Sequence, residues 1–77
     1  MKILIIGSGK VGSTIANTLS LEKFDIDIID RDELNFEKIT NTVTKIKGDV
    51  LDENFMLNFD LEKYDYAIIA TDSDKTN

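Results

Sequence analysis

A glycine-rich hexapeptide near the amino terminus constrains this chain more than any other feature. The run Lys2–Ile6 is almost wholly apolar and rich in β-branched residues, which is typical of a strand buried on both faces of a parallel sheet. The pattern GxGxxG follows at once, and a helical apolar pattern begins inside it, at Lys10. A strand, a glycine loop and a helix in this order predict a turn that cradles a pyrophosphate.

Each residue of the loop has a physical interpretation. The first glycine turns the chain out of the strand, the second lets the backbone approach a pyrophosphate, and the third lets the helix pack closely on the strand. We therefore take the whole loop as a candidate nucleotide site, consisting of Gly7, Ser8, Gly9, Lys10, Val11 and Gly12. The side chain of Lys10 either neutralises phosphate charge or is a solvated lysine of the first helical turn.

The rest of the chain alternates between strand and helix patterns. Val11, Ile15 and Leu19 are spaced at i, i+4 and i+8 and predict one apolar helix face within residues 10–21. Further strands are predicted at 24–30, 42–47 and 64–70, with short helices capped by Asp32 and by Asp52 or Asn54. The order β-α-β-α-β-α-β predicts an α/β fold, the first portion of a Rossmann-like doubly wound parallel sheet. Its strand order should be 3-2-1-4, with both faces covered.

The length of 77 residues predicts one small domain, residues 1–77. A complete dinucleotide-binding fold continues with two further strands. Residues 71–77 resemble a loop that opens another helix. We therefore expect that the chain is truncated after the fourth strand, since that strand would otherwise present an apolar edge.

Composition excludes several function classes. The chain has no Cys and no His, which removes disulfides, thiolate metal sites and the commonest general base. Its longest apolar run, Ile3–Ile6, is far shorter than the ~18 residues of a membrane span. A net charge of −6 argues against nucleic acid, but not against a phosphate held by backbone N–H groups. We expect a cytoplasmic protein without direct membrane insertion.

An acidic residue ends the second predicted strand. Asp30 lies 18 residues beyond Gly12, close to the roughly 20 expected for a carboxylate that binds ribose hydroxyls. The alternative is a solvated carboxylate or a helix cap. A carboxylate here repels a 2′-phosphate and so favours NAD(H) or an adenine nucleotide over NADP(H). The neighbouring Arg31 either accepts a 2′-phosphate, stacks on adenine, or is a surface charge.

A phosphate loop of the Walker A type is excluded by its register. That motif requires Gly-Lys followed by Ser or Thr, with another glycine five residues before the pair. Gly12 is followed by Ser13 instead of Lys. Taking Gly9 and Lys10 as the pair would require glycine in place of Leu4.

With these residues in place, the chain resembles the N-terminal domain of the TrkA family, also called the RCK or KTN domain, along its whole length. Residues 1–12 are similar to the opening strand and glycine loop of the family, and Ile28–Asp30 to its acidic strand end. Gly48–Asp52 resembles its Gly-Asp turn, and residues 65–77 its fourth strand and exit. Three positions depart from the family pattern: Val50 and Leu51 replace small residues, and Lys75 stands where an acid is common.

The resemblance implies further site residues. Asp49 and Val50 would lie against the adenine, Asp49 by hydrogen bonding; the alternative is a plain turn in which Asp49 caps its own backbone. Thr71, Asp72 and Ser73 would line the cleft near the phosphates or second ribose. The alternative for Asp72 and Ser73 is to cap the next helix.

Three functions remain open from the residues. The resemblance implies a regulatory domain, not an enzyme, whose occupancy by NAD(H) or ATP, ADP or AMP controls potassium uptake. Its partners would be copies of itself, in a homo-oligomer, and a membrane-embedded potassium transporter subunit at the inner face of the cell membrane. The alternatives are the NAD-binding fragment of a dehydrogenase, of saccharopine-dehydrogenase type, and a degenerate Rossmann fold used only for assembly. The absence of His and Cys and the exit motif favour regulation.

Overall fold

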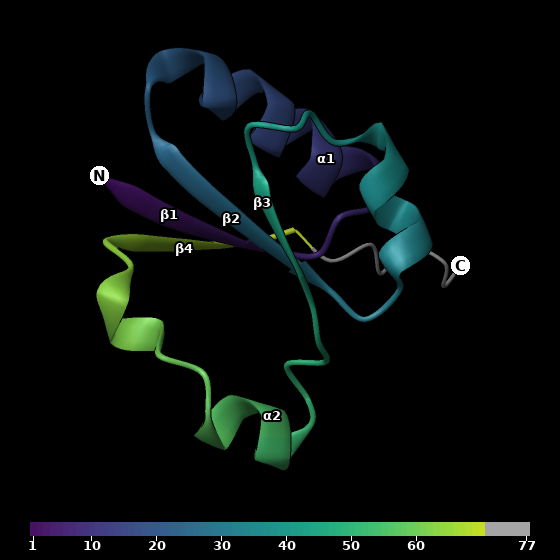
Figure 1. The fold of residues 1–77 in the computed structure, drawn as a ribbon, viewed down its shortest axis with the longest axis vertical. Coiled ribbons are helices and arrows are strands. Elements are labelled where there is room, and N and C mark those ends of the chain that lie inside the picture. Colours follow the sequence, from purple (N-terminus) through teal and green to yellow (C-terminus); the bar gives the residue numbers. More distant parts are fainter. Residues whose placement is uncertain (71–77) are drawn as a thin grey trace.

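The computed structural model describes residues 1–70, and these form a parallel sheet with helices on its two faces (Figure 1). The elements follow in the order β1 (Lys2–Ile6), α1 (Lys10–Leu19), η1 (Ser20–Glu22), β2 (Asp25–Asp30), η2 (Glu33–Lys38), β3 (Thr44–Lys47), α2 (Glu53–Leu57), η3 (Leu61–Lys63) and β4 (Tyr66–Ile69). The three η elements are 3-10 helices.

The four strands pair in the order β3-β2-β1-β4, and every pairing is parallel. The predicted strand order and Rossmann-like class are therefore confirmed. In the register, Ile5 of β1 lies between Ile28 of β2 and Ile68 of β4. All four strands end at the same edge of the sheet, where folds of this kind bind their ligands.

One face of the sheet packs against α1. Strand side chains alternate between faces, so Ile3, Ile5, Ile26 and Ile28 share this face and are buried. The helix contributes Ala16, which is also buried. Val11, predicted on the same apolar face as Ile15 and Leu19, is instead 61% exposed and lies outside this core. Partly buried apolar side chains from α1 and η2 complete this core, among them Ile15, Leu19 and Phe36.

The opposite face carries a polar group beneath an aromatic stack. Asp27 of β2 points to this side with Ile29, and both are buried. Tyr64 donates its hydroxyl to Asp27 Oδ2 at 2.6 Å. The Tyr64 ring stacks on Phe59, whose ring stacks on Phe55, at centroid distances of 5.9 and 5.5 Å. Phe55 lies in α2, and Phe59 and Tyr64 flank η3. Both elements are on the side of the sheet away from α1 (Figure 1).

Asp27 is 4% exposed, and its carboxylate has two partners. Besides the Tyr64 hydroxyl, it faces Lys2 Nζ at 3.7 Å, and the same lysine contacts Asp25 at 3.0 Å. Burial and the hydrogen bond to Asp27 raise the pKa of Tyr64 well above its ordinary value. The phenol therefore stays protonated and serves as a permanent donor to the buried carboxylate.

Several boundaries differ from the prediction. The helix expected to reach residue 21 ends at Leu19, and the chain turns through a 3-10 segment to Lys23 in the left-handed region. The second and third strands begin later than predicted. The fourth strand begins at Tyr66, two residues later than predicted. Tyr64 lies before it, and its hydroxyl donates to Asp27. Asp32 and Asp52 are the caps of their helices.

Coverage of the sheet is uneven. β1 and β2 are buried along most of their length. Among residues 1–70, β4 lies at the sheet edge with Tyr66 59% and Ile69 73% exposed. Within residues 1–70, the central strands are covered on both faces as expected, whereas β4 is largely exposed and β3 is only partly buried.

The Tyr64–Asp27 hydrogen bond gives a testable prediction of stability. Tyr64→Phe removes a donor from a buried carboxylate and should lower the free energy of unfolding by about 1.5–3 kcal/mol. The measurement is urea denaturation followed by circular dichroism. Tyr66→Phe is the matched control, because it removes an exposed hydroxyl and should change stability by less than about 0.5 kcal/mol. Equal losses in the two variants would contradict the assigned role of Tyr64.

Candidate functional site

The glycine loop joins β1 to α1 with almost no space between their backbones. Gly7 has a φ of 102°, a region that side chains disfavour. Its N–H donates to the carbonyl of Ile29 at 2.8 Å, which ties the loop to β2. A Cβ atom at Gly12 would overlap the carbonyl oxygen of Gly7. Gly7 therefore makes the turn out of β1, and Gly12 allows the close packing of α1, as the motif predicted.

The helix that follows the loop has an amino terminus without a side-chain cap. Gly9 is the N-cap residue, and the first turn of α1 holds no acidic residue. By contrast, η2, α2 and η3 begin at aspartates whose carboxylates accept a backbone N–H two residues on, namely Asp32, Asp52 and Asp60. The first N–H groups of a helix lack intrahelical acceptors and carry partial positive charge. This terminus is therefore suited to an anion.

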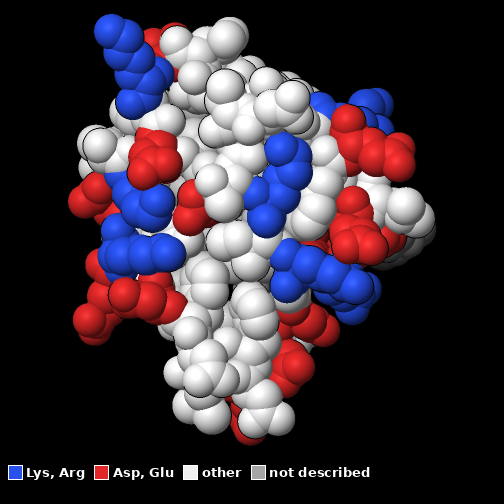
Figure 2. All heavy atoms as spheres, viewed as in Figure 1, with Lys and Arg blue, Asp and Glu red and all other residues white. Residues whose placement is uncertain are grey.

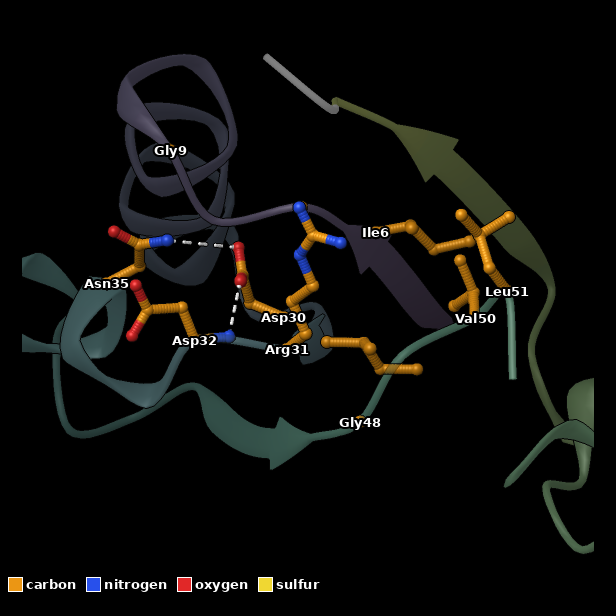
Figure 3. A pocket seen from close by; sticks show the side chains of 11 residues that line it. Ile6, Gly9, Asp30, Arg31, Asp32, Asn35, Gly48, Val50 and Leu51 are labelled. Atoms are coloured by element: carbon orange, nitrogen blue, oxygen red, sulfur yellow. Dashed lines mark hydrogen bonds between the residues drawn. The ribbon is translucent and has the colours of Figure 1, made fainter. Parts of the chain in front are cut away.

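Asp30, the last residue of β2, receives four hydrogen bonds from three segments of the chain. Its Oδ2 accepts from Ser8 N and from Ser8 Oγ, both at 2.8 Å. The same oxygen accepts from Asn35 Nδ2 at 3.4 Å, while Oδ1 accepts from Asp32 N at 2.8 Å. Figure 3 shows the bonds to Asp32 and Asn35. One carboxylate therefore holds the glycine loop, the turn after β2 and η2 together.

These contacts keep the carboxylate ionised. Partial burial alone would raise the pKa of Asp30, but hydrogen bonds from Asp32 N, Ser8 N, Ser8 Oγ and Asn35 outweigh it and hold the pKa below its ordinary value. Hydrogen bonds donated to a carboxylate favour its charged form. Asp30 is consequently an acceptor at neutral pH.

A pocket of about 620 Å³ opens at the carboxyl ends of the first three strands. Its wall has a polar part, with Asp30, Asp32 and Asn35, and an apolar part, with Ile6 and Val50 close to Leu51 (Figure 3). The full lining consists of Ile6, Gly7, Gly9, Ile29, Asp30, Arg31, Asp32, Asn35, Gly48, Val50 and Leu51. The two parts suit a ligand with a polar sugar phosphate and an apolar base.

The turn after β3 closes the pocket on its apolar side. Gly48 donates its N–H to the carbonyl of Asp30 at 3.0 Å. A Cβ at Gly48 would overlap the Phe55 ring, so the aromatic stack and the turn pack against each other. Asp49 directs its carboxylate to its own turn, where Oδ1 accepts from Leu51 N at 2.9 Å. The local-cap alternative for Asp49 is thus the arrangement in the structure.

The structure brings together five of the residues expected to bind a nucleotide. Lining the pocket are Gly7, Gly9, Asp30, Arg31 and Val50. Ser8 is 1% exposed and lies behind the loop, with its side chain on Asp30. Lys10, Val11 and Gly12 form the first turn of α1, with Gly12 buried and the other two exposed. Thr71, Asp72 and Ser73 lie outside the described residues.

Six further residues of the lining were not among the predicted binding residues, namely Ile6, Ile29, Asp32, Asn35, Gly48 and Leu51. Ile6 and Ile29 stand at or next to the carboxyl ends of their strands, and this position could have predicted that they line the pocket. Asp32 was identified only as a cap, a role that it also has. Asn35 had no signal, because its approach to Asp30 depends on how η2 folds back.

The surface charges, the acidic residues and the helix lengths add three observations about possible binding partners. On the face shown in Figure 2, acidic and basic side chains intermingle, and uncharged atoms gather at the end that carries α2. Within residues 1–70, no three acidic side chains lie where they could share a metal ion. In the same part of the chain, every helix is too short or too polar to cross a bilayer.

Comparison with known proteins follows the same elements. The family model of the TrkA-N domain matches residues 3–77. A Trk system potassium uptake protein TrkA of Vibrio alginolyticus is 28% identical over 80 residues, covering 99% of this chain and 17% of its own length.

Two further relatives are similar over the whole chain. The protein of the same name from Mycobacterium tuberculosis strain H37Rv is 30% identical over 79 residues, covering 100% of this chain and 36% of its own. A TrkA homolog of Pyrococcus abyssi is 29% identical, and the match covers 35% of its length. The chain therefore spans between about a sixth and about a third of these relatives.

The depressed pKa of Asp30 gives a prediction for pH dependence. The native carboxylate has a lower pKa than the unfolded one, about 3.9, so its stabilising effect is present above that pH and disappears as pH falls through the native pKa. Asp30→Asn should therefore lower the free energy of unfolding most near pH 7, with a difference that shrinks below about pH 4. Urea denaturation at pH 7, 5 and 3 measures this.

A control separates the hydrogen bonds of Asp30 from net charge. Glu22→Gln removes an exposed carboxylate from η1, beyond the far end of α1. Its effect on unfolding at pH 7 should be smaller than that of Asp30→Asn. A pH-independent difference between wild type and Asp30→Asn would show that the Ser8 and Asp32 contacts do not hold the pKa down.

Proposed function

The chain belongs to the TrkA-N domain family, and from this premise we propose that it is a nucleotide-binding regulatory domain of a potassium-uptake system. The ligand is NAD(H) or one of ATP, ADP and AMP. Binding shifts the equilibrium between conformations of an assembly, and no bond in the ligand is made or broken. The observation that carries the proposal is the pocket between the uncapped start of α1 and the Asp30 carboxylate.

The phosphates occupy the amino terminus of α1. Gly7 and Gly9 line the pocket there, and Gly9 presents backbone instead of a side chain at the helix start. The free N–H groups of the first turn and the helix dipole both favour a negative charge. This arrangement lets a chain with a net charge of −6 bind an anionic ligand without a basic surface.

The adenosine occupies the remaining wall. The Asp30 carboxylate accepts a hydrogen bond from a hydroxyl of the ribose, since it is ionised and lines the pocket. The base lies against the apolar part formed by Ile6, Val50 and Leu51. Arg31 lines the same pocket and supplies a cation beside the ligand. Val50, which departs from the small residues of the family, thus contributes apolar surface.

Nucleotide binding can regulate an assembly because it is thermodynamically coupled to the conformation of that assembly. A ligand shifts a conformational equilibrium by the ratio of its affinities for the two states. The relatives are named as components of a Trk potassium uptake system. We propose that this domain assembles with copies of itself at the cytoplasmic face of a membrane-embedded potassium transporter and transmits nucleotide occupancy to it.

Thermal unfolding with a ligand panel tests the proposal. NAD⁺, NADH, NADP⁺, ATP, ADP and AMP are added separately, each over a range of concentrations. A ligand at 100 times its Kd stabilises the native state by about 2.7 kcal/mol, which raises the Tm of a domain of this size by about 10 °C or more. At least one adenine nucleotide should do so, and NADP⁺ should bind more weakly than NAD⁺ because Asp30 repels its 2′-phosphate.

A pair of variants identifies the site. Gly9→Val places a side chain where the phosphate approaches the backbone and should abolish the ligand-induced rise in Tm. Glu22→Val, beyond the opposite end of α1, makes a comparable change on an exposed position and should retain the rise. Wild-type stabilisation of Gly9→Val, or no stabilisation of the wild type by any adenine nucleotide, contradicts the proposal.

A further inference from the structure

The two oxygens of the Asp30 carboxylate are unequally used. Oδ2 accepts three donors, from Ser8 N, Ser8 Oγ and Asn35 Nδ2. Oδ1 accepts one, from Asp32 N. An ionised carboxylate offers about two acceptor positions on each oxygen. Oδ2 is therefore saturated by the protein, whereas Oδ1 retains acceptor capacity.

Ser8 creates this asymmetry. It is 1% exposed, and both its N–H and its hydroxyl are directed at the same oxygen at 2.8 Å. Two short bonds from one residue fix the orientation of the carboxylate plane relative to the glycine loop. The third donor, Asn35, is more distant at 3.4 Å and reinforces the same orientation.

From this geometry we infer that Ser8 is a positioning residue that limits Asp30 to one hydroxyl of a bound ribose. A ribose presents two neighbouring hydroxyls, and a carboxylate with both oxygens free accepts from both. Here a single oxygen has capacity for a ligand donor. The site consequently distinguishes the 2′-hydroxyl from the 3′-hydroxyl, and one of the two contributes little to affinity. The inference rests on the proposed nucleotide-binding function and specifies how the ribose is recognised.

Calorimetry on the wild-type chain tests the asymmetry without any substitution. The ligands are ADP, 2′-deoxy-ADP and 3′-deoxy-ADP. Loss of a hydrogen bond to a charged acceptor should weaken one deoxy ligand by about 10-fold or more. The other should bind within about 2-fold of ADP, because its missing hydroxyl has no acceptor. Equal weakening of both deoxy ligands overturns the inference.

A pair of serine variants then tests the role of Ser8. Ser8→Ala removes one of the two short bonds to Oδ2. The donors that remain are Ser8 N at 2.8 Å and the more distant Asn35 amide at 3.4 Å, so Oδ2 gains room to accept from a ligand hydroxyl. The ratio of the two deoxy affinities should fall toward one. Ser13→Ala is the matched control, because Ser13 is also buried but donates to the carbonyl of Lys10 instead of Asp30. Its ratio should equal that of the wild type.

The outcomes separate this inference from the proposed function. If Ser8→Ala weakens all three ligands equally and leaves the ratio unchanged, Ser8 only supports the loop and the positioning role is wrong. Failure of the wild type to bind ADP or any other adenine nucleotide overturns the proposed function itself. Binding of ADP with equal loss for both deoxy ligands leaves that function intact and rejects only the inference.

Discussion

The contact between Gly12 and the carbonyl of Gly7 is the constraint on which the rest of the structure depends. A Cβ at Gly12 would overlap the Gly7 carbonyl oxygen. Because glycine lacks this atom, α1 can pack directly on the end of β1, and its amino terminus faces the carboxyl edge of the sheet. The Gly7 N–H in turn bonds to the carbonyl of Ile29, so the loop is tied to β2. The backbone geometry that we propose holds the phosphates thus follows from this packing.

Asp30 connects that loop to the rest of the site. Its carboxylate reaches Ser8, Asp32 and Asn35, and its backbone carbonyl accepts the N–H of Gly48. The ends of β1, β2 and β3 are therefore linked through one residue. The hydrogen bonds that lower its pKa also occupy Oδ2 more fully than Oδ1, so stability and the proposed ribose contact depend on the same group.

Local patterns in the sequence predicted the fold and the loop because the causes are local. A β-branched run, three glycines and a helical apolar period each act within a few residues, and together they specify β1, the turn and α1. The end of β2 at Asp30 and the caps at Asp32 and Asp52 were predictable for the same reason. The contact of Ser8 with Asp30 was not predictable, because it joins residues 22 positions apart through a register that only the sheet establishes.

Tyr64 was predicted to lie in the fourth strand. The local pattern could not show that its hydroxyl binds Asp27, because the two residues are 37 positions apart. For Asp49, two roles fitted one motif, and the structure has its side chain on its own turn.

The central claim is that an adenine nucleotide binds at the carboxyl edge of the sheet with its phosphates on the start of α1. Titration of the ¹⁵N-labelled chain with ADP, followed by two-dimensional NMR, tests it directly. The account predicts saturable shifts that are largest for the amides of residues 7–12, with further shifts at 30–31 and 48–51, and little change around Lys2 at the opposite edge. Shifts that are largest around Lys2, or no saturable shift at the glycine loop, would contradict it.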